Sequence, residues 1–158
     1  MLYAILKTIH LLSVIVWVGG MVFAQFFLRP ALAALAAPDR VRLMHAVLGR
    51  FFNAVLLAAG LALGSGVWMM GRIARQTAQA GLKVNMPLEW LVMAVLGLVM
   101  IAIFTYLRFA LYPRLTRAVA GGDWPAGGAT LARIRNWVMV NLVLGVLIVA
   151  VTLLGSSS

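Results

Sequence analysis

Residues 9–28 read IHLLSVIVWVGGMVFAQFFL and contain no Asp, Glu, Lys or Arg. A helix of this length is about 30 Å long, which matches the hydrocarbon core of a bilayer. The stretch carries one ionisable side chain, His10, and seven residues later Trp17, followed by Gly19 and Gly20. Because an ionisable group inside a membrane is costly and is usually kept for function, His10 is the first candidate site residue.

The composition extends the membrane assignment to the whole chain. Hydrophobic residues make up 65% of the 158 residues, charged residues only 10%, and the mean hydropathy is +1.07. Water-soluble domains are roughly 45–50% apolar, so we expect an integral membrane protein. We expect residues 1–154 to form a single transmembrane domain and residues 155–158 a flexible tail. The absence of cysteine excludes disulfides, thiolate metal sites and a cysteine nucleophile.

Four apolar runs, at residues 2–28, 47–70, 88–111 and 138–154, each suit the roughly 20 residues of a spanning helix. No segment shows the alternating ten-residue pattern of a membrane β-barrel. The predicted fold is therefore an all-α integral membrane bundle of four transmembrane helices. We expect Pro30 to end the first helix, Pro38 and Asp39 to begin the second, and the Gly-Gly-Asp-Trp-Pro turn at 121–125 to precede the fourth.

The basic residues predict the orientation. Nine lie in the first and third connections or at their edges, and four lie at the opposite side: Arg29, Arg40, Arg42, Arg50, Arg108, Arg114, Arg117, Arg133 and Arg135, against Lys7, Arg72, Arg75 and Lys83. The positive-inside rule then places both termini outside the cytoplasm. Anionic lipid accounts for the net charge of +10, so we expect the lipid bilayer, and no nucleic acid, as the partner of these cations.

Methionines lie at the depth predicted for His10. Met69 and Met70 end the second run, and Met86, Met93 and Met100 fall in or just before the third. Antiparallel neighbours would place these thioethers near the imidazole, and both ligand types suit soft Cu(I). The alternative is that methionine simply fills the core.

His45 precedes the second run and should lie toward the opposite face, with a level that we estimate to differ from that of His10 by about 15–20 Å. It is either a separate metal ligand or an interfacial histidine. The separation argues against one haem ligated by both histidines, and it leaves open a haem b held by His10 and another ligand.

Other polar residues give weaker signals. Four of them, one in each apolar run, could form an interhelical hydrogen-bond cluster or a polar path from His10: Gln25, Asn53, Thr105 and Asn141. Glu89 either favours the start of its helix or is an entry ligand for a cation. The three acidic residues are dispersed and no hydrolytic or phosphoryl-transfer motif is present, so the sequence does not favour an enzyme.

Three stretches together resemble CopD-type (copper resistance protein D) membrane proteins. They are LKTIHLLSVIVWVGGMVFAQFFLRPAL at 6–32, GRFFNAVLLAAGLALGSGVWMM at 49–70 and RIRNWVMVNLVLGVLIVAVTLLG at 133–155. The shared features of the first are a histidine, an aromatic-x-Gly-Gly step and an Arg-Pro exit. The resemblance implies copper movement across the bacterial inner membrane, with a periplasmic copper-binding partner.

A related four-helix group, the HemJ-type protoporphyrinogen oxidases, also has a histidine in the first span. That group has a lysine in the third span, and this sequence has none between residues 88 and 106. The sequence therefore predicts an inner-membrane protein that binds or transports copper, with His10 as principal ligand, Met69, Met70 and Met93 as candidate thioethers and His45 as a separate candidate. The alternatives are a haem b-binding protein or HemJ-like oxidoreductase, and a cofactor-free accessory subunit. Homo-oligomerisation is left open.

Overall fold

The computed structural model describes residues 1–81 and 88–155, and it describes only the backbone of Glu89 and Gly155. Nearly all of the described residues are helical, and they include no strand. Four helical segments are long and apolar enough to cross a membrane, which confirms the predicted all-α membrane fold. The elements are α1 (Leu2–Val22), η1 (Phe23–Leu28), α2 (Arg29–Ala31), η2 (Leu32–Ala34), α3 (Ala37–Gln79), α4 (Leu88–Tyr106), η3 (Leu107–Leu111), α5 (Tyr112–Ala120) and α6 (Trp124–Gly155).

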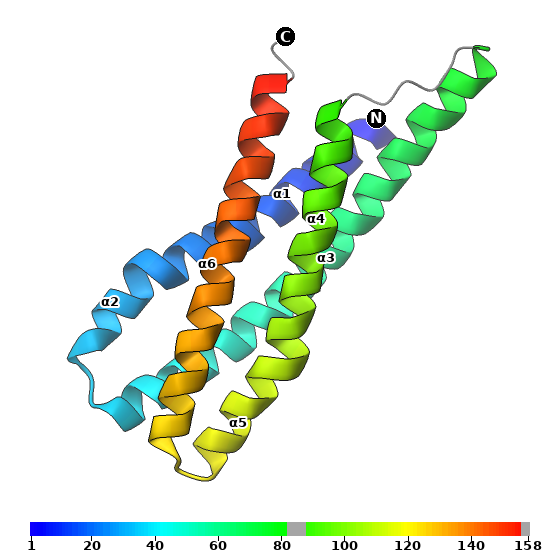
Figure 1. Ribbon diagram of the computed structural model, residues 1–158. Helices are drawn as coiled ribbons and strands as arrows, with labels where there is room; N and C mark the ends of the chain where they lie inside the picture. The colour runs from blue at the N-terminus through cyan, green and yellow to red at the C-terminus, as the bar shows by residue number, and fades with distance from the viewer. Residues whose placement is uncertain (82–87, 156–158) are drawn as a thin grey trace.

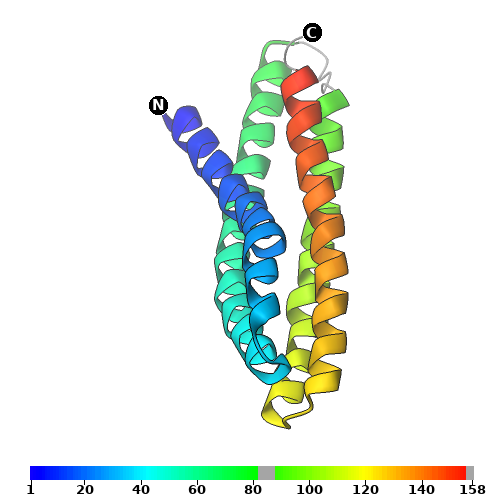
Figure 2. The same cartoon turned by 90° about the vertical axis from the view of Figure 1, so that its left-hand side faces the viewer.

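The helices form a bundle of two pairs. α1 packs mainly on α3, and α4 packs mainly on α6. The start of α1 and the end of α6 lie at one end of the bundle, and the connections that contain α2 and α5 lie at the other (Figure 1). Viewed from the side, the N-terminal end of α1 splays away from the other helices (Figure 2). The bundle therefore has a terminal end, where His10 lies, and a connection end, where most arginines lie.

The first helix does not stop at Pro30. The chain passes through a π-helical segment, η1, and a short α2 that contains the proline, and it leaves the helix only after η2. The N–H of Arg29 donates to the carbonyl of Ala24, five residues back. In an α-helix the proline ring would clash with the carbonyl group of the preceding turn. The wider π-helical turn before the proline replaces the usual i to i−4 hydrogen bonds there and so avoids this clash. The prediction that Pro30 ends the helix was therefore wrong.

The third apolar run also contains a π-helical segment before a proline. The π-helical η3 precedes Pro113, and the N–H of Tyr112 donates to the carbonyl of Leu107, again five residues back. The helix then continues as α5, so the third spanning segment reaches Ala120 rather than residue 111. In both segments the π-helical turn keeps backbone groups bonded within the chain, which hydrocarbon requires.

Local signals set the other helix ends. α3 begins at Ala37 with Pro38 in its first turn, and Asp39 places a carboxylate near the positive end of the helix dipole. Between α5 and α6, Gly122 adopts a φ of 66°, which a side chain would disfavour. Asp123 then caps α6, because its Oδ1 accepts the N–H of Ala126 at 3.0 Å. The predicted helix start and the predicted turn are both present.

Aromatic residues build the core between the two helix pairs. Phe52 on α3 is 1% exposed and makes edge contacts with Phe104 of α4 and Tyr112 of α5, with ring centroids 6.0 and 5.6 Å apart. Trp17 of α1 contacts Phe104 in the same way at 5.9 Å. Gly60 and Gly64, by contrast, are exposed, and a Cβ atom at either would meet no atom of another helix within 4 Å, so they do not mediate helix packing within this chain.

Replacement of Phe52 by alanine should therefore destabilise the bundle by on the order of 3 kcal/mol, because it removes an aromatic ring that joins three helices and leaves a cavity. Phe26→Ala is the matched control, since that side chain is 57% exposed. The change should be measured as the free energy of unfolding in mixed micelles titrated with denaturing detergent. Equal losses in the two variants would contradict this account of the core.

Candidate functional site

His10 is held against α3 by its Nδ1 atom. The ring is half-buried, and Nδ1 lies 2.9 Å from the carbonyl oxygen of Ala62 and 3.2 Å from Oγ of Ser65. A backbone carbonyl can only accept a hydrogen bond, so this network assigns the proton of the neutral imidazole to Nδ1. The Nε2 lone pair is then the ring's donor atom for a metal.

Small residues of α3 lie next to the imidazole. A Cβ atom at Gly66 would lie 3.5 Å from Cε1 of His10, which is an ordinary contact distance. Ser65 is buried and donates its own hydroxyl proton to the carbonyl of Leu61 at 2.6 Å. Its oxygen is therefore free to accept from Nδ1–H. Nothing in the sequence pattern indicated that Gly66 lies next to His10.

A cavity of about 210 Å³ opens beside His10 at the terminal end of the bundle. All four spanning segments line it, and most of its wall is aliphatic. The side chains in its lining whose chemistry would suit a metal are His10 from α1, Met70 from α3, and Met93 and Met100 from α4. The structure thus places His10, Met70 and Met93 around one cavity, together with Met100, which the sequence placed at a similar depth. Met69 is half-buried but does not line the cavity, and Met86 lies outside the described residues.

Met100 lies in the deeper part of this cavity. It is seven residues after Met93 and therefore about 10 Å further along α4. A Cβ atom at Gly145 of α6 would lie 3.3 Å from Cε of Met100 and 3.0 Å from Cγ2 of Val18. Gly145 therefore allows α1, α4 and α6 to meet around a thioether that is only 4% exposed.

Aromatic side chains bound the cavity toward the connection end. Trp17 lines the cavity and packs edge-on against Phe104, which in turn contacts Phe52. All three rings are buried in the core. Packed aromatic rings therefore adjoin the cavity on the side of the connection end.

His45 belongs to a different contact. Its Nε2 lies 2.9 Å from Oγ1 of Thr116, whose hydroxyl donates to the carbonyl of Tyr112 at 3.1 Å. Its ring stacks on Tyr112 at a centroid distance of 5.1 Å, and the Tyr112 hydroxyl donates to the carbonyl of His45. His45 precedes Ala62 by 17 residues, or about 25 Å along α3, which is more than the separation estimated from sequence. The contacts of His45 join α3 to α5.

The four polar residues of the spans do not form a mutual cluster. Gln25 donates to the carbonyl of Arg135, Asn53 accepts from Arg108, and Thr105 donates back to its own helix. Asn141 is 1% exposed, and its Oδ1 has no protein partner among the described residues. The predicted cluster was therefore wrong, although Gln25 does connect the first segment to α6. The side chain of Glu89 lies outside the described residues.

The donor set limits the chemistry of the cavity. Among the described residues, no three His, Cys, Asp or Glu side chains come together. A metal at His10 would therefore depend on thioethers, which favour soft Cu(I) over harder ions. A volume of about 210 Å³ is also below the roughly 300–1,000 Å³ of typical cofactor and ligand pockets, so the cavity gives haem b no support.

Four apolar helices around a cavity that carries an imidazole and thioethers define a multi-pass membrane protein with a soft-metal donor set. The family model of copper resistance protein D (CopD) matches residues 45–154, which is more than half of the chain. The chain therefore belongs to the CopD family, and it is a membrane protein related to copper resistance. The match begins at His45 and does not include His10. No curated protein and no solved structure matched the chain significantly.

The contacts of His45 predict a structural phenotype. His45→Phe keeps the stacking on Tyr112 and removes the hydrogen bond to Thr116, so we expect a loss of about 0.6 kcal/mol in unfolding free energy. Thr116→Val should cost a similar amount, and the double variant should cost no more than either alone. Unfolding in mixed micelles measures these values. Full additivity of the two losses would contradict the assigned contact.

Proposed function

We propose that this protein binds Cu(I) in the cavity beside His10, as part of copper handling at the bacterial inner membrane. The observation that supports the proposal best is the convergence of His10, Met70, Met93 and Met100 on one cavity lined by all four spanning segments. Membership of the CopD family supports copper as the metal. Here Cu(I) is the cargo of the protein, and the side chains of this chain are its ligands.

The proposed chemistry rests on neutral donors. Imidazole and thioether ligands add no negative charge to the membrane interior, and soft sulfur ligands prefer Cu(I) to divalent ions. The hydrogen bond from Nδ1–H of His10 to the carbonyl of Ala62 orients the ring and raises the basicity of Nε2. His10 is thus the principal ligand in this proposal. Met70 and Met93 supply two thioethers, and Met100 supplies one further along α4.

The charge distribution supports a direction of access. Nine basic residues lie at the connection end or near it, against three of the described residues at the terminal side, Lys7, Arg72 and Arg75, so the positive-inside rule favours periplasmic termini. The cavity would then be nearer the periplasmic face, and a periplasmic copper-binding protein is the expected donor or acceptor. Passage to the cytoplasmic face would be a separate step, since Trp17 and Phe104 pack across the interior beyond the cavity.

Removal of the imidazole should abolish this site. We expect His10→Ala to weaken Cu(I) binding by more than about tenfold, because loss of a second-shell partner alone typically costs 10–100-fold. Competition with a Cu(I)-specific chelator measures the affinity of the purified protein. His45→Ala is the matched control and should retain the affinity of the natural sequence. The proposal fails if the two histidine variants bind Cu(I) equally well.

The thioethers can be tested without a change in volume. Simultaneous Met70→Leu, Met93→Leu and Met100→Leu substitutions remove sulfur but keep aliphatic bulk, so the fold should persist. We expect a loss of at least about tenfold in Cu(I) affinity, since an isolated imidazole offers too few soft donors. Met69→Leu is the control, because Met69 does not line the cavity. If the triple variant kept its Cu(I) affinity, these methionines would serve only to pack the core and would not be ligands.

A further inference from the structure

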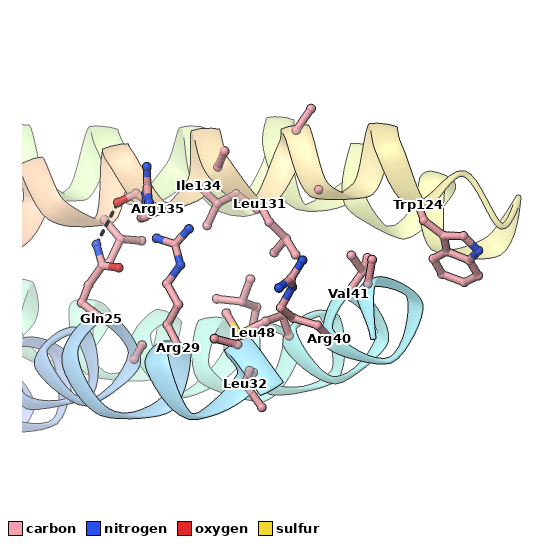
Figure 3. A pocket seen from close by; sticks show the side chains of 18 of the residues that line it. Gln25, Arg29, Leu32, Arg40, Val41, Leu48, Trp124, Leu131, Ile134 and Arg135 are labelled. Carbon is pink, nitrogen blue, oxygen red and sulfur yellow. Dashed lines mark hydrogen bonds between the residues drawn. The ribbon is translucent and has the colours of Figure 1, made fainter. Parts of the chain in front are cut away.

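A second and larger cavity lies at the connection end of the bundle. Its volume is about 570 Å³, and it is bounded by the segment η1–α2–η2, the start of α3 and the start of α6. Three arginines line it, namely Arg29, Arg40 and Arg135, together with Gln25 and Trp124. Arg29 and Arg40 extend across the cavity toward α6, where Arg135 lies (Figure 3).

The positive charge in this cavity is not neutralised by its lining. None of the residues that line it is an aspartate or a glutamate. The nearest acid in sequence, Asp39, pairs with Arg42 at 3.5 Å, and Arg42 lies over the ring of Trp124. Arg29 is half-buried and close enough to both Arg40 and Arg135 for their charges to repel. An anion between the three guanidinium groups would relieve this repulsion.

The three arginines also lie at a definite depth. Arg29 directly follows the uncharged run 9–28, and Arg135 directly precedes the uncharged run 136–155. Each run is about as long as the hydrocarbon core is thick, so both arginines lie at its edge. A hydrogen bond of 2.9 Å from the Gln25 side chain to the carbonyl of Arg135 joins the first spanning segment to α6 at this depth. Lipid phosphate groups occupy this level of a bilayer.

The rest of the lining is apolar. Aliphatic and aromatic side chains from three segments cover the wall beside the arginines, including Leu32, Val41, Leu48, Leu131 and Val138. A cavity for a free inorganic anion has no need of such a wall, whereas a lipid carries an acyl chain next to its phosphate. The combination of cations and apolar surface therefore favours an amphiphilic anion.

We propose that this cavity binds the phosphate group of an anionic phospholipid from the leaflet at the connection end. Guanidinium groups bind phosphate oxygens through paired N–H donors, so Arg29, Arg40 and Arg135 hold the headgroup. Gln25 positions Arg135 by a hydrogen bond to the backbone carbonyl of that arginine. The apolar wall accommodates the first part of an acyl chain. The site is about the length of a spanning segment away from His10, and this proposal does not depend on copper binding.

The test uses the whole chain, residues 1–158, in neutral detergent, with bound lipid counted by native mass spectrometry. The variant is Arg29→Gln, Arg40→Gln and Arg135→Gln together. The matched control is Arg114→Gln, Arg117→Gln and Arg133→Gln, which removes the same charge from exposed positions on α5 and α6 that do not line the cavity. The probes are phosphatidylglycerol, phosphatidylcholine and inorganic phosphate, each added alone.

We expect the natural sequence to retain one phosphatidylglycerol in preference to phosphatidylcholine. Each arginine near a lipid phosphate is worth about fivefold in affinity, so the cavity variant should lose about 100-fold and the control less than about threefold. Arg40→Gln alone, at an exposed position, should lose about fivefold and serves if the triple variant does not fold. If both triple variants lost the same affinity for phosphatidylglycerol, general surface charge would explain the binding and the proposal would be overturned. Binding of inorganic phosphate as tight as that of phosphatidylglycerol would assign the site to a free anion and overturn the lipid assignment.

Discussion

In hydrocarbon every backbone N–H and C=O group needs a partner within the protein, and this requirement governs the whole chain. It explains why the spanning segments remain helical through Pro30 and Pro113, each preceded by a π-helical turn with hydrogen bonds five residues back. A polar side chain in hydrocarbon needs a partner as well. The imidazole of His10 finds its partner at the carbonyl of Ala62 on the neighbouring helix α3.

The two ends of the bundle differ in their chemistry. At the terminal end, neutral donors surround a small cavity, and the one titratable ring there is fixed by a carbonyl. At the connection end, three guanidinium groups line a larger cavity that contains no acid. Packed aromatic rings, including Trp17, Phe52 and Phe104, lie in the core between the helix pairs. A soft cation and a lipid phosphate would therefore occupy separate regions of one molecule.

Much of the candidate site could be predicted from the sequence, because helical rise and antiparallel order fix the depth of a residue. Depth alone grouped His10 with Met70 and Met93, and it separated His45 from them. Depth does not give the direction in which a side chain points, so Met69 and Met70 could not be distinguished, although only Met70 lines the cavity. The same limit explains the incorrect polar cluster, since Gln25 and Asn53 share a level with other polar groups but contact arginine residues.

The sequence by itself determined that this chain is a four-helix membrane protein, because long uncharged runs have no other stable arrangement in a bilayer. It also determined the asymmetry of charge between the two ends. Only the tertiary structure decided which faces meet. Helix rotation is set by contacts between residues far apart in sequence, such as Gly66 with His10 and Gly145 with Met100. Those contacts determine which atoms line each cavity, and a pattern read along one chain does not contain them.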